Sequence, residues 1–232
     1  MIKQEQRPVY AGDLSYHLVH FLRPHCEQVC PQFFVVDVGY ERWQRIIERI
    51  MQKDKQYVFV FDLDNTLVKT NRANNESYKD AILSVVGDDV TIKKSRFTRN
   101  DLLTIRPNLS PVQITKIVEA KEACYSKHLA ETIRNEELVK SLLLLKEFGC
   151  ETVLATECHR KRAQAVCEYH SLTLLFRKQF FNEDLGDKNK YQFLESIGIS
   201  LESVVLFENE QSEIRKAIQY GLFENQIIKV KF

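Results

Sequence analysis

An apolar run that ends in two aspartates constrains the fold of this chain more than any other stretch. Residues 57–63 read YVFVFDL, and Asp62 and Asp64 stand where the run ends. A continuous apolar run of this length is typical of a strand that is buried on both faces of a parallel sheet. Carboxylates that directly follow such a strand need a partner or a cation, because an isolated buried charge is costly. The sequence therefore predicts a functional site at the end of a central strand.

Further segments predict the rest of the sheet and the helices that cover it. The segments 151–156 and 203–207 are apolar in the same way, and 226–232 is typical of a last, more exposed strand. The predicted helices between them cover 135–149, 160–169, 187–197 and 211–220, the first with Asn135 as its N-cap and Gly149 at its end. Strands that alternate with helices of this length predict an α/β fold with a doubly wound parallel sheet.

The stretch 70–134 interrupts this alternation. It has the pattern of helices and polar loops, with no clear strand, and Ser110 to Gln113 form a predicted capping box with proline at the first helical position. We expect a helical cap here, inserted after the first core strand and placed to act as a lid. The predicted core then comprises 57–69 and 135–232. Residues 1–56 form a separate lead-in of unassigned role, with a strand at 33–38 and a helix at 40–51.

Composition narrows the classes of function. The formal net charge is +1 over 232 residues, so no global bias points to nucleic acid as a partner. No apolar run approaches the roughly 18 residues of a membrane-spanning helix, and the first residues lack the apolar segment of a signal peptide. We therefore expect a cytoplasmic protein with no membrane partner. Cys26 and Cys30 follow His25 at a spacing that fits common zinc motifs poorly, so free thiols are expected.

Polar side chains follow three of the predicted strands. Asp62, Asp64 and Thr66 follow the first, Thr156 the second, and Glu208 with Asn209 the third. Because ligands bind at the carboxyl ends of parallel strands, we expect these side chains to converge. Oxygen ligands of this kind suit Mg²⁺ bound together with a substrate phosphate, and Lys188 or Lys190 supplies a further positive charge. This inventory indicates phosphoryl transfer.

Single residues in this set also have ordinary structural explanations. A strand-end threonine is often only a cap, and a lysine is usually solvated. The cap also carries a basic run, made up of Lys93, Lys94, Arg96, Arg99 and Arg106. We interpret that run as a solvated helix face in preference to the alternative, a site for a polyanionic substrate or for nucleic acid.

Four segments together resemble the motifs of the haloacid dehalogenase superfamily. FDLDNTLV resembles its first signature, and VLATECHR, with Thr156, its second. GDKNKYQFL resembles the third through Lys188, although Asn189 stands where proline is usual, and Lys190 is the alternative lysine. VVLFENEQSEIRKAIQYG resembles the fourth motif of β-phosphoglucomutase-like members, with an asparagine at 209 in place of the usual aspartate. The resemblance covers 57–232 and does not cover 1–56.

The resemblance implies a Rossmann-like core with a helical cap, and a magnesium-dependent phosphatase that hydrolyses a phosphate monoester. Asp62 would form an aspartyl-phosphate and Asp64 would be the general acid and base. Thr66, Thr156 and Lys188 are the expected phosphate ligands. The expected metal ligands are Asp62, Glu208, Asn209 and the backbone carbonyl of Asp64.

The substrate expected from this resemblance is a phosphorylated small molecule or a phosphopeptide. Two alternatives stay open. A phosphomutase of the same family shares these residues, and the uncharged Asn209 is also compatible with a catalytically weak binding or scaffold protein.

Overall fold

The computed structural model describes residues 57–232. The predicted strand at 33–38, the predicted helix at 40–51 and the cysteines Cys26 and Cys30 lie outside the described residues. Within 57–232, no helix combines the length and the apolar character needed to cross a membrane.

The core of the described region is a sheet of five parallel strands. They are β1 (Val58–Phe61), β4 (Glu151–Ala155), β5 (Lys178–Phe180), β6 (Val204–Glu208) and β7 (Ile227–Lys229), in the order β5-β4-β1-β6-β7. Because β1 lies between β4 and β6, its side chains are covered on both faces: Phe59 and Phe61 pack on one side and Val60 on the other. The predicted α/β class with a parallel, Rossmann-like sheet is confirmed.

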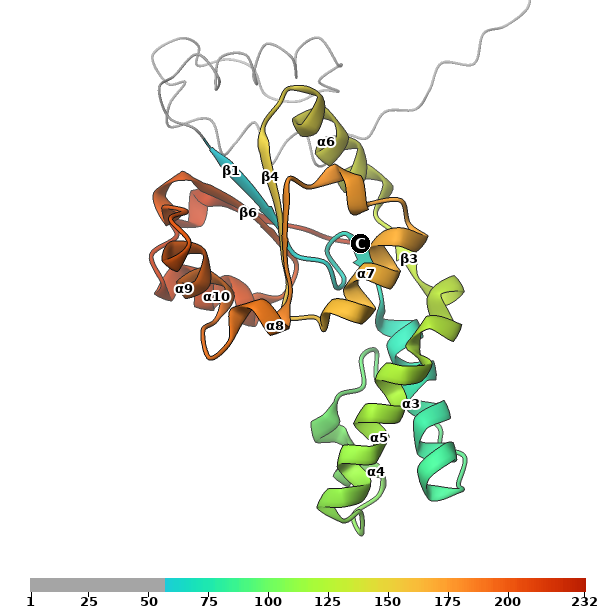
Figure 1. Ribbon diagram of the computed structural model, residues 1–232. Coiled ribbons are helices and arrows are strands. Elements are labelled where there is room, and N and C mark those ends of the chain that lie inside the picture. Colours follow the sequence, from blue (N-terminus) through green and yellow to red (C-terminus); the bar gives the residue numbers. More distant parts are fainter. Residues whose placement is uncertain (1–56) are drawn as a thin grey trace, which may run out of the picture.

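Helices cover both faces of the sheet (Figure 1). One face packs against α6 (Glu136–Glu147) and α7 (Arg160–Tyr169), and the other against α9 (Lys190–Ser196) and α10 (Gln211–Gln219). Short helical turns complete the core: η4 (Thr173–Leu175), α8 (Asn182–Leu185), η5 (Leu201–Ser203) and η6 (Glu224–Gln226). Asn135 caps α6 as expected, since its side chain accepts from the N–H of Leu138 at 3.2 Å. It also donates to the carbonyl of Thr66 at 3.3 Å, which ties the start of α6 to the turn after β1.

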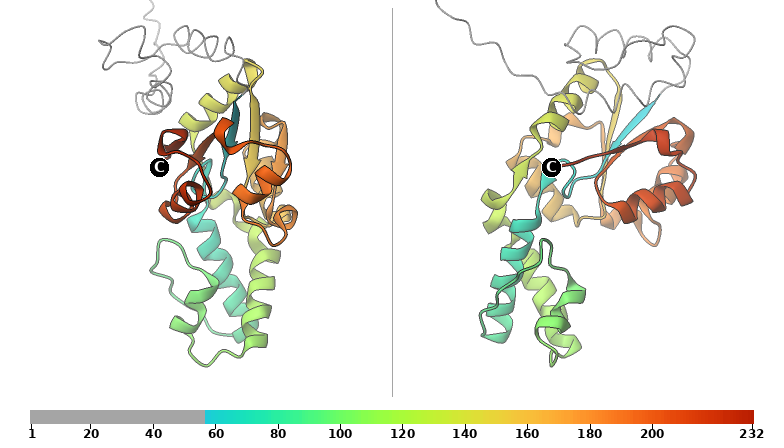
Figure 2. Two further views of the ribbon diagram at one scale, coloured as in Figure 1. Left: turned by 90° about the vertical axis from the view of Figure 1, so that its left-hand side faces the viewer. Right: turned by 180° about the vertical axis from the view of Figure 1, so that it is seen from behind.

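The cap helices extend from one end of the sheet (Figures 1 and 2). They are α3 (Asn71–Val86), η2 (Arg99–Asp101), α4 (Leu102–Ile105), α5 (Pro111–Cys124) and η3 (Tyr125–Glu131). They enclose an apolar cluster of their own, which includes Tyr78, Ile82, Phe97 and Ile117. The predicted capping box is present, because Ser110 accepts from the N–H of Gln113 and Gln113 accepts from the N–H of Ser110.

Two short strands differ from the sequence-based expectation. The chain passes from core to cap through β2 (Val68–Lys69) and returns through β3 (Ile133–Arg134), and these two strands pair antiparallel to each other. The expectation of no strand within 70–134 was therefore wrong for the last residues of that segment. β5, at the edge of the main sheet, was not predicted either. Both β3 and β5 are too short to show an alternation of apolar and polar residues, and their pairing depends on neighbours distant in sequence.

Candidate active site

The register of the sheet brings the expected polar residues to one edge. Phe61 is level with Leu154 of β4 and with Phe207 of β6, so the residues that follow these strands lie side by side. A cleft of about 230 Å³ opens at this edge. The predicted residues that line it are Asp62, Asp64, Thr156, Lys190 and Glu208. Four segments of the core therefore contribute to one site.

A tight turn after β1 fixes Asp64. Asn65 has a φ of 59°, in the left-handed region that asparagine tolerates better than most residues, and its N–H donates to the carbonyl of Val68 at 2.7 Å. The Asn65 side chain also accepts from the N–H of Thr70 at 3.2 Å. The Thr70 hydroxyl in turn donates to Asp64 Oδ1 at 2.7 Å. The chain thus reverses within a few residues and presents Asp64 to the cleft.

Lys190 holds three carboxylates at the floor of the cleft. Its ammonium pairs with Glu208 Oε2 and lies 3.7 Å from Asp62 Oδ1 and 3.8 Å from Glu213 Oε2. Lys190 and Glu208 are each only 1% exposed, so solvent screens these charges weakly. Burial lowers the pKa of Lys190, but Asp62 and Glu208 raise it by more, so the lysine is charged. Lys216 Nζ also lies 2.5 Å from Glu213 Oε1, so two ammonium groups face three carboxylates and a surplus of negative charge remains.

The pKa of Asp62 lies well above its ordinary value. Burial is the largest cause, and the repulsion from Glu208 is the next, while Lys190 acts in the opposite direction. Both oxygens of Glu208 already have partners, since Oε1 accepts the N–H groups of Asn209 and Glu210 at 2.9 and 3.0 Å. Of these two carboxylates, Asp62 is therefore the one that gains more from an additional cation.

Asp64 has a different electrostatic environment. Arg96 Nη2 lies 3.1 Å and Arg162 Nη2 3.3 Å from Asp64 Oδ2. Burial would raise the pKa of Asp64, but the two guanidinium groups and the Thr70 hydroxyl more than offset it, so this pKa lies well below its usual range. The two aspartates after β1 therefore differ: the pKa of Asp62 is raised, whereas the pKa of Asp64 is lowered by the two arginines beside it.

Arg162 was not predicted from the sequence. It belongs to α7, its Nε donates to Cys158 Sγ at 2.9 Å, and its Nη1 lies 3.3 Å from Glu122 Oε1 of the cap. The available signal was the basic triplet at 160–162, which opens the helix directly after the Thr156 segment. The side chain of Arg162 is 11% exposed, so it belongs to the interior of the cleft and not to a solvated face.

The basic run of the cap divides into two groups. Lys94 pairs with Asp101, and Arg106 lies 3.4 Å from Asp88, which are surface ion pairs of the expected solvated kind. Arg96 is the exception, because it lines the cleft and contacts Asp64. The interpretation as a solvated face was therefore incorrect for this one residue.

Three predicted site residues do not line the cleft. Lys188 is exposed in the turn before α9, whereas Lys190, the first residue of that helix, reaches the carboxylates. The structure thus places Lys190 at the carboxylates, and not Lys188, the lysine preferred from the sequence. Thr66 is fully buried, and its hydroxyl donates to Asn209 Oδ1 at 3.0 Å. Thr66 and Asn209 therefore bind each other and do not line the cleft. Thr156 does line the cleft, and its hydroxyl accepts from the N–H of Cys158 at 3.3 Å.

The donor set of the cleft fits a hard divalent cation. Asp62 and Glu208 offer carboxylate oxygens, and Glu213 Oε2 is buried without a hydrogen-bond partner although it lies at the same ammonium. Oxygen donors with excess negative charge are typical of Mg²⁺ sites. Asn209 is the weakest candidate among the expected side-chain ligands, because its amide carries no charge and its oxygen already accepts from Thr66.

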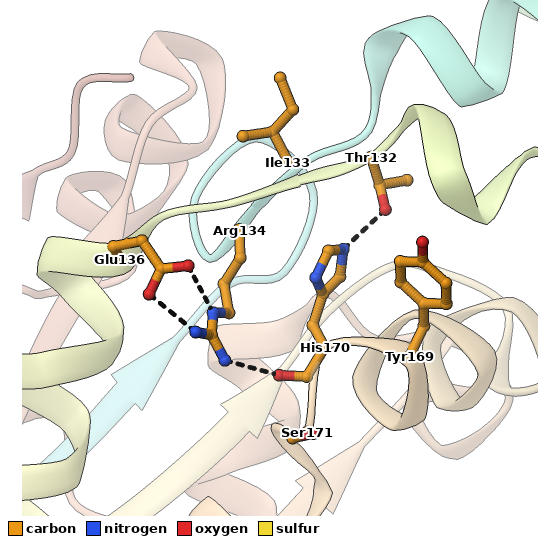
Figure 3. Close-up of a pocket in the computed structure, with 7 residues that line it drawn as sticks. All are labelled: Thr132, Ile133, Arg134, Glu136, Tyr169, His170 and Ser171. Atoms are coloured by element: carbon orange, nitrogen blue, oxygen red, sulfur yellow. Dashed lines mark hydrogen bonds and ion pairs between the residues drawn. The ribbon is translucent and has the colours of Figure 1, made fainter.

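A second cavity lies at the junction of cap and core (Figure 3). It has a volume of about 440 Å³ and is lined by residues of β3 and of the end of α7. Its polar groups bind one another: Arg134 donates twice to Glu136, at 2.8 and 2.9 Å, and once to the carbonyl of His170, at 3.1 Å. The Thr132 hydroxyl lies 2.6 Å from His170 Nε2. Because its one carboxylate, Glu136, is paired with Arg134, this cavity has no surplus of negative charge of the kind found in the cleft.

Comparison with known proteins places the fold. No protein-family model and no curated protein matches the sequence. The structure resembles CbbY from Rhodobacter sphaeroides in complex with phosphate, with a TM-score of 0.58 and 19% identity over 72% of this chain and 84% of that one. It resembles a family IA hydrolase of the haloacid dehalogenase type from Entamoeba histolytica, with a TM-score of 0.59 and 20% identity over 72% and 82%.

A haloacid dehalogenase-like hydrolase from Streptococcus pneumoniae is similar as well, with a TM-score of 0.61 and 16% identity over 76% of this chain and 85% of that one. At these identities the likeness establishes the fold. The chain therefore has the fold of haloacid dehalogenase-like hydrolases, and the resemblance inferred from its four motifs is confirmed at that level.

The position of Lys190 leads to a stability prediction. Replacing Lys190 with methionine leaves the carboxylates of Asp62 and Glu208 buried without their cation, and breaking a buried pair in this way costs about 3–5 kcal/mol. Lys188→Met, the same change on an exposed lysine, should alter stability by no more than about 0.5 kcal/mol. Urea unfolding of both variants at pH 7 measures the difference. Equal stabilities would show that Lys190 is not the buried counter-charge of this site.

Proposed function

We propose that this chain is a magnesium-dependent phosphatase that hydrolyses a phosphate monoester through an aspartyl-phosphate on Asp62. The observation that carries the proposal is the convergence of Asp62, Asp64, Thr156, Lys190 and Glu208 in one cleft at the carboxyl edge of the sheet. Each kind of group that phosphoryl transfer requires is present there: a nucleophile, an acid–base residue, donors for the phosphoryl oxygens and oxygen ligands for a cation.

Asp62 is the proposed nucleophile. Its carboxylate attacks phosphorus, the bond from phosphorus to the leaving oxygen breaks, and water later attacks the phosphorus of the aspartyl-phosphate to release inorganic phosphate. The carboxylate must be ionised to attack, and its raised pKa shows that the protein alone does not favour this form. Mg²⁺, held by Asp62, Glu208 and the Asp64 carbonyl, would supply positive charge that keeps this carboxylate ionised and neutralises the phosphoryl oxygens.

Asp64 is the proposed general acid and base. Arg96 and Arg162 keep Asp64 ionised, so it is free to accept a proton, but the same contacts lower its pKa and weaken it as a base. As an acid it must carry a proton, and this requires that the two arginines be drawn toward another anion. A phosphorylated substrate brings that anion into the same cleft, so we infer that the arginines are shared between Asp64 and the substrate.

Lys190 and Thr156 are the proposed phosphate ligands. The Lys190 ammonium lies between Asp62 and Glu208, which places positive charge beside the nucleophile. The Thr156 hydroxyl lies at the end of β4, in the wall of the cleft. The solved structure of CbbY holds phosphate, and this likeness of fold supports a phosphorylated small molecule or phosphopeptide as substrate. The segment 70–134, which delivers Arg96 to the cleft, is the proposed lid.

A second candidate function is a binding or scaffold protein on the same fold. The specific observation in its favour is Asn209, which brings no charge and whose amide oxygen is engaged by Thr66. A phosphomutase is a third candidate, since it requires the same groups in the cleft. The scaffold predicts no turnover of any phosphate ester, whereas the mutase predicts transfer of phosphoryl to a second hydroxyl of a sugar phosphate.

The first prediction concerns the nucleophile. Asp62→Asn keeps the shape of the side chain but removes its nucleophilicity, so hydrolysis of an aryl phosphate in the presence of Mg²⁺ should fall by at least about a thousandfold, or roughly 4 kcal/mol in activation free energy. Asp187→Asn, the same change on an exposed aspartate, should leave turnover unchanged. Hydrolysis that persists in Asp62→Asn, in a preparation free of other phosphatases, would exclude the aspartyl-phosphate route.

The second prediction concerns the cap. Arg96→Ala removes the one residue of the basic run that reaches Asp64, so KM for a polyanionic sugar phosphate should rise about tenfold and its dependence on salt should weaken. Lys93→Ala, in which an exposed cation of the same run is lost, is the matched control and should leave KM unchanged. Equal effects of the two substitutions would mean that the run acts only through its overall charge.

The third prediction concerns the metal. Glu208→Gln removes one negative charge from the proposed Mg²⁺ site and should weaken the affinity for the ion by about ten- to a hundredfold. Asn209→Asp adds a charge and should strengthen it. The measurement is a Mg²⁺ titration of activity and of thermal stability in the three proteins side by side. Identical affinities would place the ion away from Glu208 and Asn209.

A further inference from the structure

Three side chains with metal-binding atoms meet in the cap, away from the cleft. Asp80 belongs to α3, Cys124 is the last residue of α5, and His128 lies in η3. A carboxylate oxygen, the thiol sulfur and a ring nitrogen of this group all lie within 4.8 Å of one another. His128 Nε2 is 2.9 Å from Asp80 Oδ2. Cys124 and His128 both face α3, since the Cys124 thiol donates to the carbonyl of Ser77 and the His128 ring contacts Asp80.

The chemistry of this trio suits zinc. Zn²⁺ binds cysteine sulfur, histidine nitrogen and aspartate oxygen at about 2.0–2.3 Å in a tetrahedron, so its ligand atoms lie about 3.3–3.8 Å apart. Shifts of roughly 1 Å bring the three atoms to that spacing, which exposed side chains can make by small rotations. The Asp80 side chain is 48% and the His128 ring 18% exposed, so an ion can enter from solvent and keep a water as its fourth ligand.

We propose that Asp80, Cys124 and His128 form a binding site for Zn²⁺ or a similar thiophilic divalent cation, which joins α3 to the junction of α5 and η3. The bound ion would replace two weak contacts of the Cys124 thiol, which donates to the carbonyls of Ser77 at 3.4 Å and Lys121 at 3.5 Å. A thiolate, a carboxylate and a neutral imidazole bring two negative charges to the ion. Two cations near Cys124, Lys127 and Lys121, would repel the ion, and Lys121 already pairs with Glu122.

The proposed metal site is connected to the cleft through residues close to Cys124. Glu122 and Tyr125 flank Cys124 in sequence, and both contact Arg162: Glu122 Oε1 lies 3.3 Å from its Nη1, and the Tyr125 ring lies 5.3 Å from its guanidinium carbon. A cation that fixes the turn at Cys124 would therefore also fix two neighbours of the arginine that contacts Asp64. The proposed metal site does not depend on what reaction the cleft catalyses.

The competing explanation is an ordinary Asp–His pair beside a half-buried cysteine. The described region contains a similar carboxylate–imidazole pair: His159 Nδ1 lies 3.1 Å from Glu183 Oε1, and both side chains are about half exposed. The neighbouring Cys158 is buried, its thiol accepts from Arg162 Nε, and it does not form a cluster of metal-binding atoms with this pair. This pair is the matched control, since it offers a similar carboxylate and imidazole but no thiol.

The test is a titration of the full-length protein with Co²⁺ as a probe for Zn²⁺. Cys26→Ser and Cys30→Ser form the background, so that thiols of the first 56 residues do not compete, and excess Mg²⁺ occupies the carboxylates of the cleft. We expect one equivalent of Co²⁺ to produce the near-ultraviolet absorption of a cobalt–thiolate bond, and one equivalent of Zn²⁺ to remove it. Zn²⁺ should also raise the Tm of this protein.

Variants identify the ligands. Cys124→Ser should abolish the thiolate band, and Asp80→Asn and His128→Ala should each weaken binding by more than the roughly tenfold to hundredfold typical of groups behind a metal ligand. His159→Ala should leave the affinity unchanged. The absence of a thiolate band in the parent protein, or a band that survives Cys124→Ser, would overturn the proposal, and neither result depends on whether the other variants fold.

Discussion

The surplus of negative charge around Lys190 is the constraint on which the rest of the site depends. A single ammonium that is 1% exposed faces carboxylates from β1, β6 and α10. Removing several charges from water costs several kcal/mol for each ion unless their pairing is good. The parallel sheet makes the pairing possible, because it brings the carboxyl ends of β1 and β6 level with each other. The charge that remains unbalanced favours the binding of an additional cation beside Asp62.

Asp64 couples this chemistry to the position of the cap. Its carboxylate accepts from Arg96, which the cap delivers, and from Arg162, which α7 delivers. The same Arg162 contacts Glu122 and Tyr125 in the C-terminal part of the cap segment. A movement of the cap would therefore change the charge next to Asp64. In the proposed mechanism, these two guanidinium groups link the access of substrate to the charge state of Asp64.

Much of this architecture follows from local sequence signals, and the remainder from contacts between distant residues. Three features each depend on only a few consecutive residues and were therefore predictable. They are the apolar run before Asp62, the Asn135 cap and the Ser110 capping box. The choice between Lys188 and Lys190 had one local signal, the capping box of Asn189 and Gln192 that starts α9 at Lys190. Which lysine reaches the carboxylates depends on its contacts with Asp62 and Glu208, which are distant in sequence. Arg162 reaches Asp64 across 98 residues, a distance over which sequence pattern carries no signal.

The central claim is that Asp62 carries the phosphoryl group during turnover. The most direct measurement is to quench the working protein in acid, reduce it with borohydride and sequence the peptides by mass spectrometry. Reduction converts an aspartyl-phosphate to homoserine and leaves a free aspartate unchanged. The account predicts homoserine at position 62, with Asp64 intact, and only when a phosphate ester and Mg²⁺ are both present. Unmodified Asp62 during measurable turnover, or homoserine at position 64, would contradict it.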